Sequence, residues 1–289
     1  MRLLVTGAGG MLAADVLGAA ERAGHEAIPL GRESLDVTRG EAVSEALARL
    51  PADALLNCAA FTDVDGAEQA REAAFAVNAT GAGHLARAAA GRGIPMLHVS
   101  SDYVFDGAGR LDASGRRRPY VESDPTGPRS AYGQSKLAGE GEVLAASALH
   151  TVVRSSWLFG LHGRSFVATM LRAGGERESV EVVDDQVGCP TWTAHLAPAL
   201  IGLLEREVRG LVHLAGGGEV SWNGFAREIF RQAEMACEVR AATTAQLARP
   251  APRPAYSALA SERPDVLPMP PWQDGLAGFL AARAGIMRA

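Results

Sequence analysis

Apolar and polar residues follow one another along the chain in blocks that predict strands and helices in turn. Residues 2–6 form a short apolar run, a glycine-rich turn follows, and residues 11–23 repeat apolar side chains at helical spacing. Three more apolar runs and two Ala-rich helical stretches come next: 25–30, 54–58 and 95–100, and about 39–50 and 65–92. Strands alternating with helices predict an α/β fold of Rossmann type, a doubly wound parallel sheet with helices on both faces.

The pattern becomes less regular in the second half of the chain. Residues 106–129 are rich in Gly, Pro, Ser and Arg and predict one long loop, of a length that is often functional. A helix is expected from Ser130 or Ala131, and a strand at 151–155. Helices are then expected at 164–172, 193–206, 221–236 and 271–283, and strands at 180–183 and 211–214.

These elements predict two domains. A nucleotide-binding Rossmann domain is expected over 1–158, with a return segment around 188–214 that completes its sheet. A smaller mixed α/β substrate domain is expected over 159–289, mainly from 159–187 and 215–289. The length of 289 residues suits one large or two coupled domains.

Composition narrows the class of protein. The chain is 47% hydrophobic and 21% charged, which is typical of a globular protein. Its net charge of −5 offers no general attraction to nucleic acid or to anionic membranes. The three cysteines have neither disulfide-framework nor zinc-site spacing, no apolar run is long enough to span a membrane, and residues 1–6 do not resemble a signal peptide. A cytoplasmic protein is expected.

The glycine turn Gly7-Ala8-Gly9-Gly10 between the first strand and helix is the first chemical signal. A dinucleotide diphosphate needs such a turn for close backbone approach, and the helix N-terminus attracts its charge. Beyond the second strand, Arg32 can pair with the 2′-phosphate of NADPH, which makes NADPH the expected cofactor, although NADH is not excluded. Asp36 either meets the adenine or caps a helix, and Arg32 could instead be a solvated cation.

Tyr132 and Lys136 form the second signal, a YxxxK pair that places a phenol and an ammonium on one helix face. A nearby cation is expected to lower the pKa of the phenol toward neutrality, so that the phenol can take part in acid–base chemistry. Ser101 follows the strand at 95–100, at the sheet edge where open α/β folds bind ligands. Its hydroxyl could hydrogen-bond the carbonyl oxygen that Tyr132 protonates.

With these motifs the chain resembles the dTDP-4-dehydrorhamnose reductase family of extended short-chain dehydrogenase/reductases. The resemblance covers nearly the whole sequence, and its more specific motifs lie downstream of the glycine turn. They are 57–65 (NCAAFTDVD), 100–107 (SSDYVFDG), 154–160 (RSSWLFG), 185–191 (DQVGCPT) and 253–259 (RPAYSAL).

The resemblance implies hydride transfer from the cofactor to C4 of a 4-keto-6-deoxyhexose carried on dTDP, most directly dTDP-4-dehydro-L-rhamnose. Tyr132 would deliver the proton, Lys136 would hold the nicotinamide ribose and lower the pKa of Tyr132, and Ser101 would orient the ketone. The expected substrate residues are Ser101, Asp102, Tyr103 and Trp157. The expected cofactor residues are Gly7, Gly10, Met11, Leu12, Arg32, Asp36, Val37, Ala59, Ala60, Phe61, Thr62, Tyr132 and Lys136.

Several alternatives stay open at this point. Phe61, Gly66 and Tyr256 depart from the residues usual in the family, which allows a different 4-keto-deoxysugar nucleotide as substrate. A non-catalytic regulatory subunit of the methionine adenosyltransferase type is a second alternative, and a dehydratase or epimerase with tightly bound NAD is a third. Trp157 could be a core aromatic residue. A homodimer is compatible with the family, but Asp15 is expected to be solvated and no metal is predicted.

Overall fold

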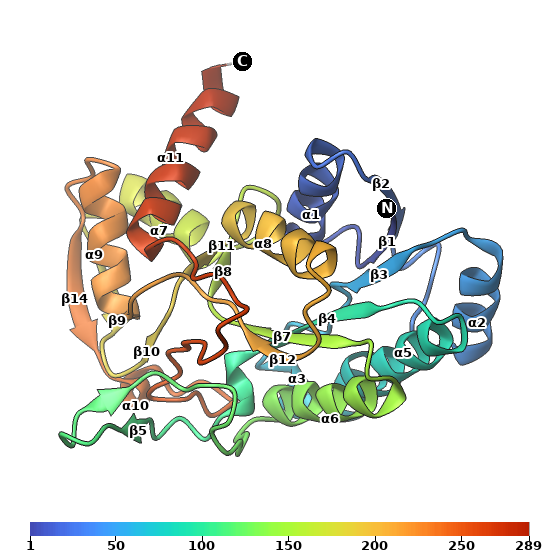
Figure 1. The fold of residues 1–289 in the computed structure, drawn as a ribbon. Coiled ribbons are helices and arrows are strands. Elements are labelled where there is room, and N and C mark those ends of the chain that lie inside the picture. The colour runs from blue at the N-terminus through green and yellow to red at the C-terminus, as the bar shows by residue number, and fades with distance from the viewer. Residues whose placement is uncertain (289) are drawn as a thin grey trace.

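The computed structural model describes residues 1–288 and is built around one sheet of six parallel strands (Figure 1). The strand order is β12-β7-β4-β3-β1-β2, which confirms the predicted doubly wound α/β fold. Because β1 lies between β2 and β3, the chain changes direction across the sheet at β1, and the crevice there is where such sheets bind ligands. The strands are β1 Arg2–Thr6, β2 Glu26–Leu30, β3 Ala54–Asn57, β4 Met96–Ser101, β7 Thr151–Ser155 and β12 Gly210–His213.

Helices cover both faces of this sheet (Figure 1). Successive side chains of a strand point to opposite faces, so Leu3 and Val5 join one apolar cluster and Leu4 joins the other. Burial on both sides explains why the strands read as continuous apolar runs. The first face is covered by α1 (Met11–Arg22) and α8 (Thr193–Glu205), and the second by α2 (Gly40–Arg49), α5 (Ala82–Gly91) and α6 (Ala131–Ala146).

The helical stretch expected at 65–92 is divided into several pieces. Helices α3 (Gly66–Gln69) and α4 (Arg71–Phe75) precede a π-helical turn at Ala76–Gly81, after which α5 begins. The wide turn presses the backbone of Asn78 against α6, where a Cβ on Gly139 would lie 2.0 Å from the Asn78 carbonyl oxygen. Periodicity within one segment could not predict this close contact, because the contact involves a glycine in another helix.

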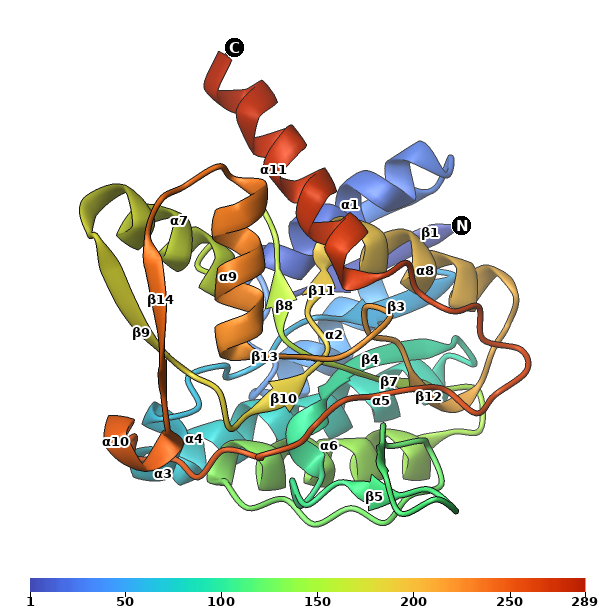
Figure 2. The same cartoon turned by 90° about the vertical axis from the view of Figure 1, so that its left-hand side faces the viewer.

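The C-terminal region packs around its own apolar cluster. Helices α7 (Phe166–Glu176) and α9 (Trp222–Gln232) lie beside the parallel strands β9 (Ser179–Val183) and β14 (Glu238–Ala242). Helix α11 (Trp272–Arg288) begins on this cluster, and its last turns extend away from the rest of the chain in both views (Figures 1 and 2). The sequence analysis did not predict β14, because its sequence EVRAA contains no continuous apolar run. Only Val239 and Ala242 of this strand are buried.

The expected loop at 106–129 contains a short hairpin, β5 (Arg110–Leu111) with β6 (Arg117–Arg118). After the hairpin, Tyr120 is fully buried and donates its backbone N–H to Ala258 O at 2.8 Å. The segment is therefore part of the packed structure. The remaining elements are a 3-10 turn at Asp102–Val104, β8 Leu158–Phe159, β10 Val187–Gly188, β11 Thr191–Trp192, β13 Val220–Ser221 and α10 Thr244–Leu247. Of these, β8 pairs with β11 and β10 with β13.

Candidate active site

A cavity of about 880 Å³ opens at the carboxyl ends of the parallel strands. All the residues expected to bind cofactor or substrate line it, and they come from segments spread between residues 7 and 157. The cavity lies beside the ends of β1 and β3, where the chain reverses the direction in which it adds strands to the sheet. The structure thus brings the whole predicted set of site residues to one place.

The glycine turn has the geometry that a diphosphate requires. Gly7 has φ of +71°, and a Cβ there would lie 2.7 Å from the backbone nitrogen of Ala59. A Cβ on Gly9 would meet no atom within 4 Å, so the backbone is open to a close approach. Helix α1 begins after Gly10 without a side-chain cap, which leaves its first N–H groups for an anion. These residues fit a dinucleotide.

Arg32 and Asp36 lie along the same cavity but differ in what they offer. Asp36 Oδ1 accepts hydrogen bonds from Thr38 N at 3.0 Å and from Thr38 Oγ1 at 2.8 Å. These bonds hold the pKa of Asp36 below its usual value. The carboxylate therefore bonds within its own turn and does not cap α2, whose N-cap Arg39 makes no side-chain capping bond, whereas Arg32 is exposed beside the cavity. Of the two, Arg32 has the chemistry to meet a phosphate.

The wall formed by residues 59–62 is held by a residue that the sequence analysis did not identify. Asn78 is fully buried in the π-helical turn, and its Oδ1 accepts the backbone N–H of Phe61 at 2.8 Å. Its Nδ2 donates to Phe61 O at 3.1 Å and to Ser135 Oγ on α6 at 2.9 Å. Asn78 thus ties the cofactor wall to the helix that carries Tyr132. The break in the helix at 65–92 was the only signal, and periodicity did not reveal it.

Tyr132 and Lys136 occupy the first turns of α6. Ser130 is the N-cap of this helix, and its Oγ accepts the backbone N–H of Gly133 at 3.1 Å. A Cβ on Gly133 would lie 2.2 Å from Tyr103 O, so glycine lets α6 approach the turn after Ser101 closely. Lys136 is 2% exposed and donates from Nζ to Val99 O at 2.7 Å. The phenol of Tyr132, the ammonium of Lys136 and the hydroxyl of Ser101 come from residues that line the same cavity.

The pKa of the phenol differs from the expectation. Burial raises the pKa of Tyr132 to about 12; a hydrogen bond with Ser101 lowers it, and the charge of Asp102 raises it further. Burial also lowers the pKa of Lys136 to about 8, against the opposing effects of Glu140 and Cys58. The prediction that Lys136 draws the pKa of Tyr132 down to neutrality is therefore wrong for this arrangement, because desolvation dominates. At neutral pH Tyr132 is a protonated phenol, the form that can donate a proton.

Asp102 and Tyr103 surround Ser101 rather than simply facing the cavity. Asp102 is 2% exposed and accepts hydrogen bonds from Ser101 Oγ at 3.0 Å and from Ser257 Oγ at 2.6 Å. Burial raises the pKa of Asp102 to about 6, although both hydroxyls act in the opposite direction. The ring of Tyr103 meets the ring of Tyr132 edge to face, with centroids 5.5 Å apart. Each oxygen of the Asp102 carboxyl accepts one of these bonds, and the small exposed fraction of the residue leaves little of it to contact a substrate.

Trp157 forms an aromatic wall with Trp222, a residue for which no role was anticipated. Their rings stack with centroids 3.5 Å apart and planes within 5°. Trp157 has φ of +46°, and Gly188 lies so close that a Cβ there would meet the indole at 2.5 Å. Both indoles and Arg164 line the cavity, so Trp157 is not only a core aromatic residue. A bulky residue held at positive φ is uncommon and often marks a functional site.

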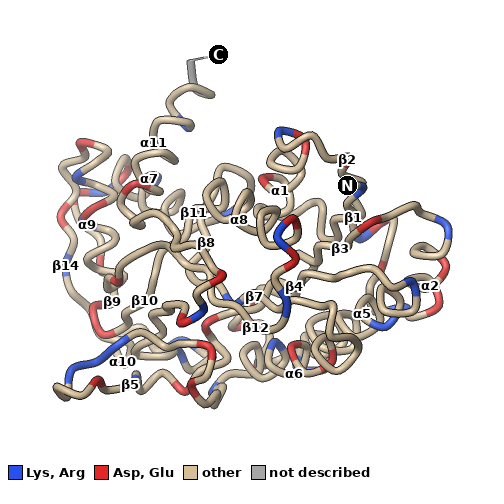
Figure 3. Tube along the Cα trace, in the orientation of Figure 1, with Lys and Arg blue, Asp and Glu red and all other residues tan. Residues whose placement is uncertain are grey.

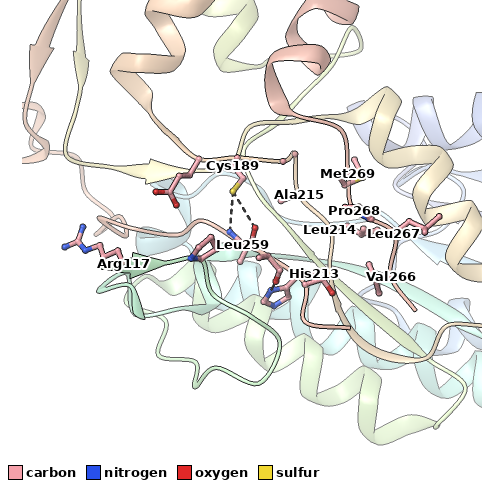
Figure 4. A pocket seen from close by; sticks show the side chains of 17 residues that line it. Arg117, Cys189, His213, Leu214, Ala215, Leu259, Val266, Leu267, Pro268 and Met269 are labelled. Carbon is pink, nitrogen blue, oxygen red and sulfur yellow. Dashed lines mark hydrogen bonds between the residues drawn. The ribbon is translucent and has the colours of Figure 1, made fainter. Parts of the chain in front are cut away.

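Charged groups outside the cavity include ion pairs between residues that are close in the sequence. The Arg116–Arg118 run is the long blue segment at the β5–β6 hairpin in Figure 3. Arg118 pairs with Asp124 at 2.7 Å, and Arg117 lies over the ring of Tyr256 and lines a second cavity of about 600 Å³ (Figure 4). Residues expected to bind cofactor or substrate are absent from that lining.

Asp15 lies on α1 and is partly exposed. The expectation that Asp15 is solvated does not hold for its Oδ2, which is buried and has no hydrogen-bond partner among residues 1–288. Within the same residues, no group of three or more His, Cys, Asp or Glu side chains could hold a metal ion. Over that range, no helix is both long and apolar enough to cross a membrane.

A dinucleotide turn on the first strand, a hydroxyl at the end of β4 and a Tyr–Lys pair on α6 make the chain an extended short-chain dehydrogenase/reductase, an NAD(P)H-dependent oxidoreductase. Residues 1–284 match the family described as RmlD substrate binding domain. The chain belongs to this family, that of the dTDP-4-dehydrorhamnose reductases.

Individual relatives agree with this assignment over nearly their whole length. The chain is 46% identical to a dTDP-4-dehydrorhamnose reductase from Mycobacterium tuberculosis, covering 98% of this chain and 93% of the relative. It is 41% identical to a probable dTDP-4,6-dihydroxy-2-methyloxan-3-one 4-ketoreductase from Streptomyces antibioticus, with 96% and 93% covered. A crystal structure of the reductase from Bacillus anthracis in complex with NADP superposes with a TM-score of 0.92, at 34% identity and 97% and 99% coverage. The predicted family and enzyme class are confirmed.

Proposed function

We propose that this enzyme uses NADPH to reduce the C4 ketone of a dTDP-4-keto-6-deoxyhexose, with dTDP-4-dehydro-L-rhamnose as substrate and dTDP-L-rhamnose as product. The proposal rests on one observation, the meeting of Ser101, Tyr132 and Lys136 in the cavity that begins at the glycine turn. A ketone bound there lies beside both a neutral phenol and a second hydroxyl. The identity of the substrate follows the relatives that share nearly the full length of the chain.

The cofactor supplies the hydride when bound, and the chain supplies its binding groups. The open backbone at Gly9 and the uncapped start of α1 suit the diphosphate. Arg32 suits the 2′-phosphate that distinguishes NADPH from NADH. Lys136 lies on the helix turn after Tyr132, and its buried ammonium would hold the nicotinamide ribose.

Proton delivery to the ketone oxygen falls to Tyr132. Its raised pKa keeps the phenol protonated at neutral pH, so it can donate as negative charge develops on that oxygen. When the ketone is bound, the O–H of Ser101 turns from Asp102 to the same oxygen, donates a hydrogen bond to it and stabilises the charge. The ketone carbon gains the hydride and the oxygen gains the proton of Tyr132, which yields the alcohol.

The sugar nucleotide would lie against the aromatic wall of Trp157 and Trp222. A flat indole surface suits the apolar face of a deoxysugar or a base, and Arg164 in the same lining suits the diphosphate. Enclosure between these residues and the cofactor wall would exclude water from the reacting groups.

A second 4-keto-deoxysugar nucleotide is the alternative substrate, favoured by the similarity to the Streptomyces antibioticus ketoreductase. Phe61 departs from the family pattern and lines the cavity, so it bears on sugar selection. Tyr256 also departs, but it is 2% exposed and its hydroxyl donates to Glu219 outside this lining. A panel of 4-keto-deoxysugar nucleotides assayed with NADPH and NADH separates these substrates. The cytoplasmic location and a homodimer stay predictions.

The reaction is tested by following NADPH consumption with dTDP-4-dehydro-L-rhamnose for the wild type and Tyr132→Phe. Loss of a general acid lowers kcat by about 10²- to 10⁴-fold, while the affinity for NADPH stays the same. Tyr120→Phe is the matched control, because Tyr120 is buried and its hydroxyl contacts Asp106 away from the cavity. Equal rates for wild type and Tyr132→Phe would refute the proton donor, and a wild type inactive with every sugar nucleotide of the panel would refute the function.

A further inference from the structure

Ser257 reaches the catalytic hydroxyl through one buried carboxyl group. Its Oγ donates to Asp102 Oδ2 at 2.6 Å, and Ser101 Oγ donates to Asp102 Oδ1 at 3.0 Å. Ser257 is 1% exposed and Asp102 is 2% exposed, so water does not compete strongly for these bonds. A residue that lies 156 positions beyond Ser101 in the sequence is therefore two hydrogen bonds away from its hydroxyl group.

The position of Ser257 itself is determined by neighbours on both sides. Its backbone N–H donates to Val187 O at 2.8 Å, while the preceding N–H, of Tyr256, donates to Gly107 O at 3.0 Å. On the other side, Ala258 O accepts the N–H of Tyr120 at 2.8 Å. The segment 256–258 is thus bonded to three separate parts of the chain. The Ser257 hydroxyl is held where it can fix Asp102.

Ser101 is held from two directions. Asp102 Oδ1 accepts its hydroxyl hydrogen, and the backbone N–H of Tyr103 donates to its oxygen at 3.2 Å. A serine side chain can otherwise adopt three staggered rotamers, only one of which keeps Oγ at a given place on a cavity wall. An acceptor locked by Ser257 favours that single rotamer. The Ser101 oxygen is then in place before the ketone arrives, and its single hydrogen has only to turn from Asp102 to the ketone oxygen, which lowers the cost of ordering the group during the reaction.

We propose that Ser257 is a positioning residue which, by fixing the carboxyl group of Asp102, holds the Ser101 oxygen at the place from which its O–H can turn to the ketone. This inference rests on the proposed ketone reduction. It gives Asp102 a role behind Ser101 in place of the expected direct contact with the sugar. It also gives the motif at 253–259 a function, since one hydroxyl of that motif extends from the C-terminal region to the catalytic group.

Ser257→Ala tests the inference through steady-state kinetics with dTDP-4-dehydro-L-rhamnose and NADPH. A misplaced Ser101 hydroxyl lowers kcat by about 10- to 100-fold, whereas KM for both substrates stays within about twofold. Ser257→Thr restores the hydroxyl and should recover most of kcat. Ser257→Cys keeps the size of the side chain with a poor hydrogen-bond donor, and should show the low kcat even if the alanine variant folds badly.

Thr151→Val is the matched control for a purely structural effect. Thr151 is 1% exposed and donates to Val208 O at 2.7 Å, at the opposite end of β7 from the cavity. Thermal unfolding of Ser257→Ala and Thr151→Val shows what the loss of each hydroxyl costs in stability. Only Ser257→Ala should also lower kcat. An unchanged kcat in a folded Ser257→Ala or Ser257→Cys, or a folded Ser257→Thr that recovers nothing, overturns the inference. A wild type that consumes no NADPH refutes the proposed function instead.

Discussion

Arg32 is the residue on which the preference for NADPH over NADH is expected to depend. It lies exposed beside the cofactor cavity, and the neighbouring Asp36 is engaged by Thr38. Replacing Arg32 with Ala removes the guanidinium that would pair with the 2′-phosphate of NADPH. NADH has no such phosphate, so its binding should not depend on this side chain.

The size of the effect follows from the exposure of Arg32. Hydrogen bonds to charged groups contribute about 1.5–3 kcal/mol, and solvent screening of an exposed pair reduces this to about 1–2 kcal/mol. The predicted increase in KM for NADPH is therefore about 5- to 30-fold, since about 1.4 kcal/mol corresponds to a factor of ten. High salt should diminish the difference between wild type and Arg32→Ala, because it screens the same pair.

The assay measures kcat and KM for NADPH and NADH with a saturating sugar nucleotide. Arg39→Ala is the matched control, because Arg39 is also exposed and near Asp36 but is not among the residues that line the cavity. Arg32→Ala should raise only KM for NADPH, and Arg39→Ala should change neither value. Equal increases in KM for both cofactors would show that Arg32 supports the turn rather than the phosphate, and the reasoning would fail.

Two further predictions concern the helix that carries the catalytic pair. Glu140 on α6 accepts from Arg154 Nε at 2.9 Å and Nη2 at 2.7 Å, with both side chains 4% exposed. Glu140→Gln leaves a buried cation unpaired and should lower the free energy of unfolding by about 3–5 kcal/mol in denaturant titrations; a loss below about 1 kcal/mol would contradict this. The pKa of Lys136, lowered by burial to about 8, predicts that kcat/KM falls as the pH rises through about 8 and the ammonium loses its proton. A decline that begins only above pH 10, near the usual lysine pKa, would show that this charge is not needed below that pH.

Much of the site could be predicted because its motifs are local. The glycine turn, the hydroxyl after β4 and the i, i+4 pair each lie within one strand end or one helix turn. Parallel strands place their carboxyl ends at one edge, so the position of each motif along its own element was enough to bring Ser101 and Tyr132 together. The sheet could also be predicted locally, because strands covered by helices on both faces appear in the sequence as continuous apolar runs.

Where the sequence analysis was wrong or incomplete, distant segments decide the environment. The pKa of Tyr132 is raised because the fold buries the phenol, and spacing from Lys136 could not reveal that burial. Asp15 was expected to be solvated on its helix, but packing covers one of its carboxylate oxygens. The helical stretch at 65–92 is interrupted where Asn78 meets Gly139 of another helix.

The sequence by itself determined the alternation of strands and helices in the parallel sheet, the dinucleotide turn and the class of chemistry, because hydrophobic period and short motifs act over a few residues. Only the tertiary structure decided that Ser257 donates to Asp102, that Trp222 stacks on Trp157, and that Arg32 is open to the cavity. Such contacts join residues far apart in the chain or depend on how a side chain is turned. They form only when the whole core packs, so no local pattern of residues encodes them.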